Sequence, residues 1–174
     1  MIWLKTLGVA CIISGFGSYG LMGARHIEKR VEELKNIRMS MGFLEKEITY
    51  MQTPLSRALQ KTARLSNPPL QIFFAECSRR LQDRQGISIV EAWDAALLKL
   101  RAVSHLKEED LDILRAASAQ LGSSGIEEQK KLFQLLQEQL QIQEENARTT
   151  MESGRKLWSY GGFILGAVVV LLLI

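Results

Sequence analysis

The sequence contains only two cysteines and two histidines among 174 residues, and this scarcity excludes several kinds of site. Cys11 and Cys77 form no Cys-Xaa-Xaa-Cys pair, and neither lies at metal-ligand spacing from His26 or His105. A disulfide framework needs more cysteines, and a zinc site needs closely spaced cysteine and histidine ligands. We therefore expect no metal and no cofactor, and we expect both thiols to be buried or to face lipid.

Charged residues are almost absent from both ends of the chain. Thr6–Ala24 contains 19 uncharged residues, and Leu157–Ile174 contains 18. At about 1.5 Å per helical residue, each run comes close to the ~30 Å hydrocarbon thickness of a bilayer. We therefore predict one transmembrane helix within residues 1–24, another in residues 157–174, and membrane lipid as a partner. Cleavage of the first run as a signal peptide is the alternative, which the length of the run disfavours.

Small residues within the two apolar runs mark surfaces where membrane helices pack closely. Ala10, Ser14 and Ser18 follow one another at four-residue steps, and Gly162 and Gly166 form the same kind of step. Such small-xxx-small spacing lets helix backbones approach each other in lipid. These five residues are the candidate contacts for transmembrane helix packing.

Basic residues flank the apolar runs mainly on the side of the central segment. Arg25 and Lys29 follow the first run, Arg155 and Lys156 precede the second, and only Lys5 lies outside. The positive-inside rule therefore predicts that residues 25–156 form a cytoplasmic domain. In this segment 21 basic residues alternate with 19 acidic ones, so no basic stripe forms and a nucleic-acid partner is not expected.

Apolar residues in the central segment recur with helical spacing, and no alternating run indicates a strand. The chain is interrupted at Thr53–Pro54, at residues 66–69, at Gly86, at Ser104 and at residues 122–125. These breaks divide the segment into about six helices, which predicts an all-α antiparallel bundle. The first helix should bury a stripe made of Ile27, Val31, Leu34, Ile37, Met41, Leu44, Ile48 and Met51.

Local signals predict where several of these helices begin and end. Ser88 and Glu91 have the spacing of a capping box, in which each side chain bonds the backbone of the other residue. Thr53 and Ser104 are expected to cap the helices that follow them. Gly86 is expected to adopt the left-handed conformation common after a helix end.

The central segment shows no arrangement typical of catalysis. Neither histidine forms a triad with a nucleophile, and no glycine-rich phosphate loop with Gly-Lys-Ser/Thr occurs, so we expect no enzymatic activity. Acidic residues cluster at positions 108–112, in the first turn of a predicted helix. A favourable interaction with the helix dipole explains this cluster better than binding of a metal cation does. The candidate contacts for a protein partner are two charged groups, Arg79, Arg80 and Arg84, and Glu108, Glu109, Asp110 and Asp112.

Several segments together resemble the stage III sporulation protein AB family of endospore-forming bacteria, and the resemblance covers the whole chain. The segments are the glycine-rich first apolar run, Glu47-Ile48-Thr49-Tyr50-Met51-Gln52-Thr53-Pro54-Leu55, Gln85-Gly86-Ile87-Ser88 before Ala92-Trp93, Leu121-Gly122 before Ser124-Gly125, and the last apolar run. The family looks like the cytoplasmic domain of the type II secretion F protein, an inner-membrane platform.

The resemblance implies a non-catalytic assembly platform in a secretion-like channel complex. That complex would link mother cell and forespore, with the domain on the mother-cell side of the outer forespore membrane. The expected partners are a secretion-type ATPase, other membrane components of the complex, and further copies of the chain. The alternative is a signalling or scaffolding coiled coil anchored at both ends, which the proline and glycine breaks disfavour.

Overall fold

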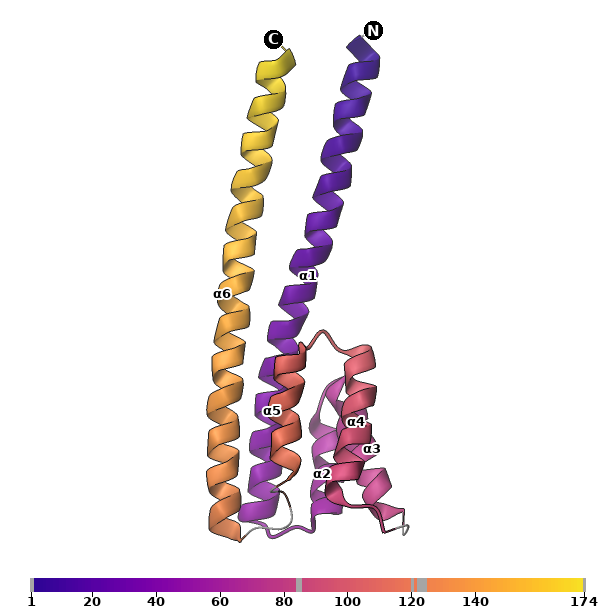
Figure 1. Cartoon of the computed structure of the whole chain (residues 1–174), viewed down its shortest axis with the longest axis vertical. Coiled ribbons are helices and arrows are strands. Elements are labelled where there is room, and N and C mark those ends of the chain that lie inside the picture. The colour runs from indigo at the N-terminus through magenta and orange to yellow at the C-terminus, as the bar shows by residue number, and fades with distance from the viewer. Residues whose placement is uncertain (1, 84–85, 120, 122–124, 174) are drawn as a thin grey trace. The chain divides into compact units, whose positions relative to one another are not determined.

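The computed structural model describes the backbone of residues 2–83, 86–119, 121 and 125–173, and the side chains of residues 25–83, 86–119, 121 and 125–154. The described residues form helices α1 (Ile2–Thr49), α2 (Leu55–Leu65), α3 (Leu70–Gln82), α4 (Ile89–Val103), α5 (Glu108–Ser118) and α6 (Ile126–Leu173) (Figure 1). No strand occurs among these residues, which confirms the predicted all-α class with six helices.

The chain divides into two compact units. One unit combines the chain ends, Met1–Lys29 and Ala147–Ile174, and the other is Arg30–Asn146. No helix in the part of the chain with described side chains has the length and apolar character needed to cross a membrane. The predicted spans Thr6–Ala24 and Leu157–Ile174 lie outside that part. The packing candidates within them also lie outside it, namely Ala10, Ser14, Ser18, Gly162 and Gly166.

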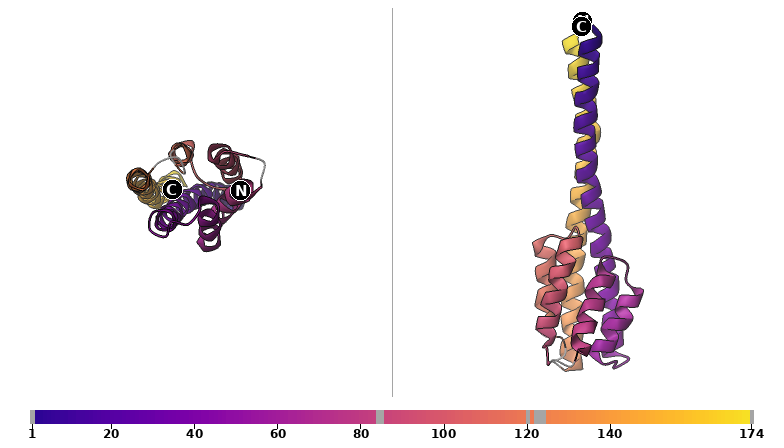
Figure 2. Two further views of the ribbon diagram at one scale, coloured as in Figure 1. Left: turned by 90° about the horizontal axis from the view of Figure 1, so that it is seen from below. Right: turned by 90° about the vertical axis from the view of Figure 1, so that its right-hand side faces the viewer.

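The unit Arg30–Asn146 is a helical bundle in which neighbours in sequence pack side by side. Helix α2 packs on α3, α3 on α4, and α4 on α5 (Figure 1). The left-hand view of Figure 2 looks nearly along the helix axes of this unit. Helices α1 and α6 contact each other through Gln137, whose amide donates to the Arg38 carbonyl over 2.9 Å. The predicted helical bundle is therefore confirmed for this unit.

The core is built from the apolar faces that the helical spacing predicts. Leu34, Ile37, Met41 and Leu44 of α1 are fully buried. Trp93 of α4 is also fully buried, and its indole N–H donates to the carbonyl of Leu114 in α5 over 2.8 Å. The bond satisfies the one polar group of that ring, which lets the indole be buried between α4 and α5.

The predicted signals around α4 are present in the structure. The Ser88 hydroxyl accepts from the Glu91 N–H over 3.2 Å, and the Glu91 carboxylate accepts from the Ser88 N–H over 3.0 Å. This confirms the capping box. Gly86 has a φ of 70°, which confirms its left-handed conformation, although α3 already ends at Gln82.

Two other predicted caps are wrong. Thr53 does not cap α2, because its hydroxyl donates to the Glu47 carboxylate over 2.7 Å and the cap position is Pro54, which has no side-chain bond. Ser104 ends α4, and α5 begins only at Glu108 after Lys107. The Thr53 hydroxyl bonds a carboxylate six residues earlier, and Ser104 lies at the end of one helix instead of at the start of the next; the local sequence pattern reveals neither.

Candidate protein-interaction surfaces

A basic cluster on α3 and α4 surrounds one buried carboxylate. Glu76 is only 7% exposed and accepts from Arg79 over 2.8 Å, from Arg80 over 2.7 Å and from Lys99 over 2.9 Å. Hydrogen bonds from Arg79, and then from Lys99 and Arg80, hold the pKa of Glu76 at about 2, although burial opposes this shift. Three cations around one anion make this a structural ion-pair network that ties α3 to α4.

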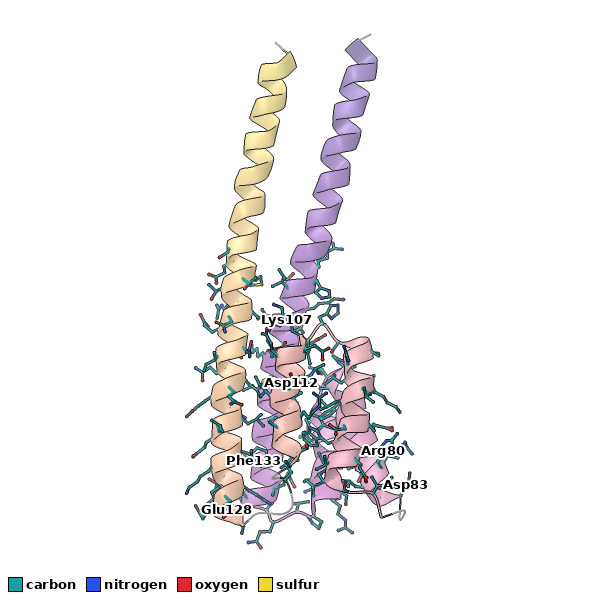
Figure 3. The ribbon with its side chains drawn as sticks, in the orientation of Figure 1. Arg80, Asp83, Lys107, Asp112, Glu128 and Phe133 are labelled. Atoms are coloured by element: carbon teal, nitrogen blue, oxygen red, sulfur yellow. The ribbon has the colours of Figure 1, made fainter. Side chains whose placement is uncertain are left out.

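The predicted basic contacts therefore belong largely to the framework of the domain. Arg79 also pairs with Asp83 over 3.0 Å, and Figure 3 shows Arg80 and Asp83 near the same end of α3. Arg79 remains more than half exposed and Arg80 one-third exposed, so both can still touch a partner at the edge of a contact. Arg84 lies outside the described residues.

The predicted acidic contacts divide into exposed and buried members. Glu108, Glu109 and Asp112 are exposed on α5. Glu108 pairs with Arg101 of α4 over 2.8 Å, and Asp112 pairs with Arg115 on its own helix. These three residues stay available on the surface shared by α4 and α5.

Asp110 does not belong to that surface, which corrects the prediction made for it. Its side chain has no exposure, and both carboxylate oxygens accept from Arg30 of α1 over 2.8 Å. One oxygen also accepts from the backbone N–H of Lys107 over 2.8 Å. The hydrogen bond from the Arg30 guanidinium to Asp110 raises the pKa of Arg30 above its ordinary value. Asp110 thus fastens the start of α5 to α1.

An exposed leucine lies in the middle of the charged surface on α4. Leu98 is 66% exposed, and Asp94 and Arg101 lie four residues before it and three after it on the same helix face. Both neighbours reach across to α5, Asp94 to Arg115 over 3.5 Å and Arg101 to Glu108 over 2.8 Å. An apolar side chain flanked by polar pairs has the composition of a protein contact.

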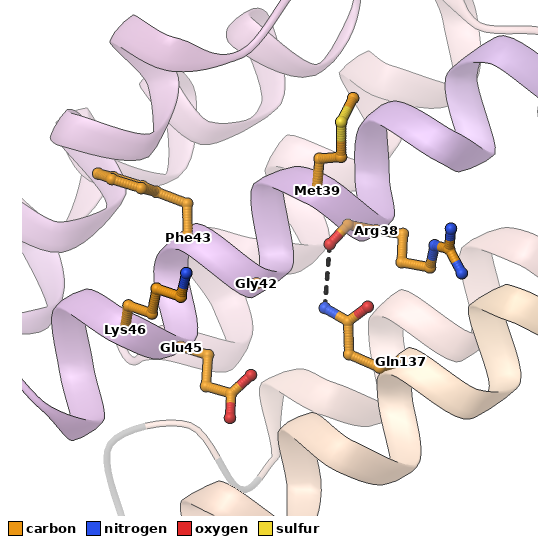
Figure 4. A pocket seen from close by; sticks show the side chains of 7 residues that line it. All are labelled: Arg38, Met39, Gly42, Phe43, Glu45, Lys46 and Gln137. Atoms are coloured by element: carbon orange, nitrogen blue, oxygen red, sulfur yellow. Dashed lines mark hydrogen bonds between the residues drawn. The ribbon is translucent and has the colours of Figure 1, made fainter.

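A groove of about 480 Å³ runs along the outer side of α1 next to α6. Figure 4 shows the residues that line it and the hydrogen bond from the Gln137 amide to the Arg38 carbonyl. Burial raises the pKa of Glu45 at its edge. The lining residues are Arg38, Met39, Gly42, Phe43, Glu45, Lys46 and Gln137.

His105 and Cys77 are both held within the bundle. The backbone N–H of His105 donates to the Glu33 carboxylate over 2.7 Å, and its ring Nδ1 lies 2.9 Å from the other carboxylate oxygen. Cys77 is buried in α3, and burial raises its pKa to about 12. Among the side chains that the structure describes, no group of histidine, cysteine and carboxylate residues could hold a metal ion.

The sequence interpretation missed the groove and the exposed Leu98. The sequence contained a signal for Leu98, because this large apolar residue does not share the helical spacing of the buried residues of its helix. The groove had no such signal, since it forms only where Gln137 meets a segment of α1 about 100 residues earlier. The network at Glu76 could have been found from its i,i+3 and i,i+4 spacing to Arg79 and Arg80.

Comparisons with known proteins agree with this architecture. A family profile described as stage III sporulation protein AB matches residues 5–174. The chain is 28% identical over 170 residues to stage III sporulation protein AB of Bacillus subtilis (strain 168), covering 98% of this chain and 99% of that protein. A solved structure of a stage III sporulation protein AB superposes with a TM-score of 0.66 at 27% identity, covering 71% of this chain and 97% of the other.

Proposed function

The chain belongs to the stage III sporulation protein AB family and has a role in sporulation, and from this premise we propose that it is a non-catalytic membrane platform on which other proteins assemble. One observation carries the proposal. Buried charged groups of the described domain pair across helices, as in Arg30 with Asp110 and Glu76 with Lys99, and so join one helix to another. Such pairing favours a rigid scaffold, whereas an active site needs reactive groups aimed at a substrate.

The proposed platform is anchored in lipid at both ends. Thr6–Ala24 and Leu157–Ile174 have the length and apolar character of membrane spans in the sequence. Arg25, Lys29 and Lys156 lie next to the spans on the side of the domain, which favours a cytoplasmic domain. In the proposed arrangement the domain lies on the mother-cell side of the outer forespore membrane.

The proposed partners are a secretion-type ATPase, membrane components of a channel complex between mother cell and forespore, and further copies of the chain. The resemblance to the type II secretion F protein that the sequence suggests supports this set by analogy. The surface of α4 and α5 around Leu98 suits the ATPase, because its exposed apolar centre is flanked by Arg101 with Glu108 and Asp94 with Arg115. Charged pairs at the rim guide orientation, and the buried apolar anchor supplies most of the affinity.

A pull-down of the tagged full-length protein from sporulating cells tests this proposal. The substitution Leu98→Asp should remove the ATPase from the eluate, because it places a charge at the apolar centre of the contact. Leu65→Asp is the matched control, since Leu65 is also 66% exposed but lies at the end of α2. Equal recovery of the ATPase with both variants would contradict docking at Leu98, and the absence of any ATPase with the unsubstituted protein would contradict the platform.

A further inference from the structure

Helix α6 carries an apolar stripe on the face that points away from the core. Leu135 is 53% exposed and Ile142 is 60% exposed, and the two lie seven residues apart. Glu138 lies between them on the same face and is also exposed. In the described part of the chain Glu138 forms no salt bridge, so α6 presents two apolar side chains with an available carboxylate between them.

Helix α1 presents a matching face beside the groove. Lys35, Met39, Gly42 and Lys46 follow one another at steps of four, three and four residues and therefore lie on one side of the helix. Met39 is 56% exposed, and Gly42 has no side chain, which leaves a hollow that Phe43 borders. Neither lysine forms a salt bridge within the described residues, so this face offers apolar surface with available positive charge.

Contacts between α1 and α6 within one copy show which residues of the two helices lie at the same height along the helix axes. The Lys130 ammonium lies 5.8 Å from the centre of the Tyr50 ring, and Arg38 pairs with Glu144 over 3.2 Å. Helices α1 and α6 therefore run antiparallel. At equal height, Ile142 corresponds to about Met39, Glu138 to about Gly42, and Leu135 to about Lys46.

We propose that the α6 stripe of one copy, Leu135, Glu138 and Ile142, docks against the α1 face of a second copy, Lys35, Met39, Gly42 and Lys46. With both copies in the same orientation, Ile142 meets Met39, and Glu138 enters the hollow at Gly42 within about one helical turn of Lys46. The apolar side chains of Ile142 and Met39 then face each other at one level, and the Glu138 carboxylate lies about one turn from the Lys46 ammonium, which attracts it. This inference rests on the self-association in the proposed function and identifies the surfaces that form it.

The contact joins two different faces, so each copy can bind one neighbour through α6 and another through α1. Such head-to-tail contacts form a ring when the rotation closes and an open row when it does not. The equal height of the matching residues lets neighbouring copies share one orientation, which suits chains anchored in one membrane. A contact between identical faces would instead stop at a pair.

Disulfide crosslinking of full-length protein tests the contact. Two differently tagged copies, one with Met39→Cys and one with Ile142→Cys, are co-expressed in a Cys11→Ser background, and their membranes are oxidised. Both positions are more than half exposed, so the substitutions leave the core intact. We expect a mixed disulfide between the two tags and none between copies with the same tag. No mixed disulfide, or crosslinking of Met39→Cys to itself, would overturn the proposal.

A control cysteine and a charge exchange sharpen the test. Leu98→Cys is similarly exposed on α4 and should not crosslink to Met39→Cys; an equal yield would overturn the proposal. Glu138→Lys on the Ile142→Cys copy should lower the rate of crosslinking about fivefold, and Lys46→Glu on the other copy should restore it. Failure of the second change to restore the rate would contradict the pairing of Glu138 with Lys46.

The two proposals fail in distinguishable ways. If the ATPase is recovered in the pull-down but no mixed disulfide forms, the α6-to-α1 contact is wrong and the platform stands. If the mixed disulfide forms but no ATPase is recovered, self-association through these faces stands and the platform is wrong.

Discussion

Removal of the Asp110 carboxylate should destabilise the domain more than removal of any exposed carboxylate on the same helix. The side chain is fully buried, and both of its oxygens accept from Arg30 over 2.8 Å. Asp110→Ala leaves the Arg30 guanidinium buried without an anion, which costs about 3–5 kcal/mol. It also removes the bond to the Lys107 N–H at the start of α5, worth about 1 kcal/mol. We expect a loss of about 3–5 kcal/mol in the free energy of unfolding, because the two contributions overlap.

Urea unfolding of the full chain in detergent measures this loss. Replacing Trp3 and Trp158 by Phe leaves Trp93, buried between α4 and α5, as the fluorescent reporter. Asp112→Ala is the matched control, because Asp112 is exposed and pairs only with an exposed arginine, so its loss should cost less than about 1 kcal/mol. The double variant Arg30→Met with Asp110→Leu should recover part of the stability. Equal effects of Asp110→Ala and Asp112→Ala would refute the reasoning.

Three further predictions follow from single residues. Because the pKa of Glu76 is lowered to about 2, its stabilising effect is complete above the ordinary carboxyl pKa and fades as the pH falls from about 4.5 toward 2. In an acid titration, Glu76→Gln should therefore lose about 1–2 kcal/mol less over this interval than the unsubstituted protein, since the partner cations are partly exposed; an unchanged profile would contradict this role. Cys77 should resist a disulfide reagent at pH 8 in a Cys11→Ser background and react only on unfolding, because it is buried with a pKa of about 12; rapid labelling of the native protein would show that the site is open. Gly86→Ala should lower the free energy of unfolding by about 1 kcal/mol because φ is 70° there, whereas Gly125→Ala, which meets open space, should change it by only a few tenths.

Periodicity and capping chemistry predicted most of the domain, because these signals act over a few residues. The helical spacing identified Leu34, Ile37, Met41 and Leu44 as buried, and the Ser88–Glu91 spacing identified a capping box that is present. Met51 was expected to continue the stripe of α1, yet it is 70% exposed because the helix ends at Thr49. The spacing of apolar residues continued past the point where the backbone leaves the helix.

The contacts that join distant segments could not be predicted in this way. Arg30 and Asp110 are 80 residues apart, and each alone reads as an ordinary surface charge of an amphipathic helix. Only when α5 lies against α1 does the pair become a buried salt bridge, and Asp110 is then no longer part of the predicted partner surface. The exposed surface around Leu98 could not be predicted for the same reason, because it is formed by residues of α4 and α5 that only the fold brings side by side.

Photo-crosslinking in living sporulating cells tests the central claim most directly. A photoreactive amino acid at position 98 of the full-length protein should form an adduct with a secretion-type ATPase, identified by mass spectrometry. The same amino acid at the equally exposed position 65 should not. Adducts with the ATPase from position 98 alone are the predicted result, and their absence from position 98, or equal adducts from position 65, would contradict the account.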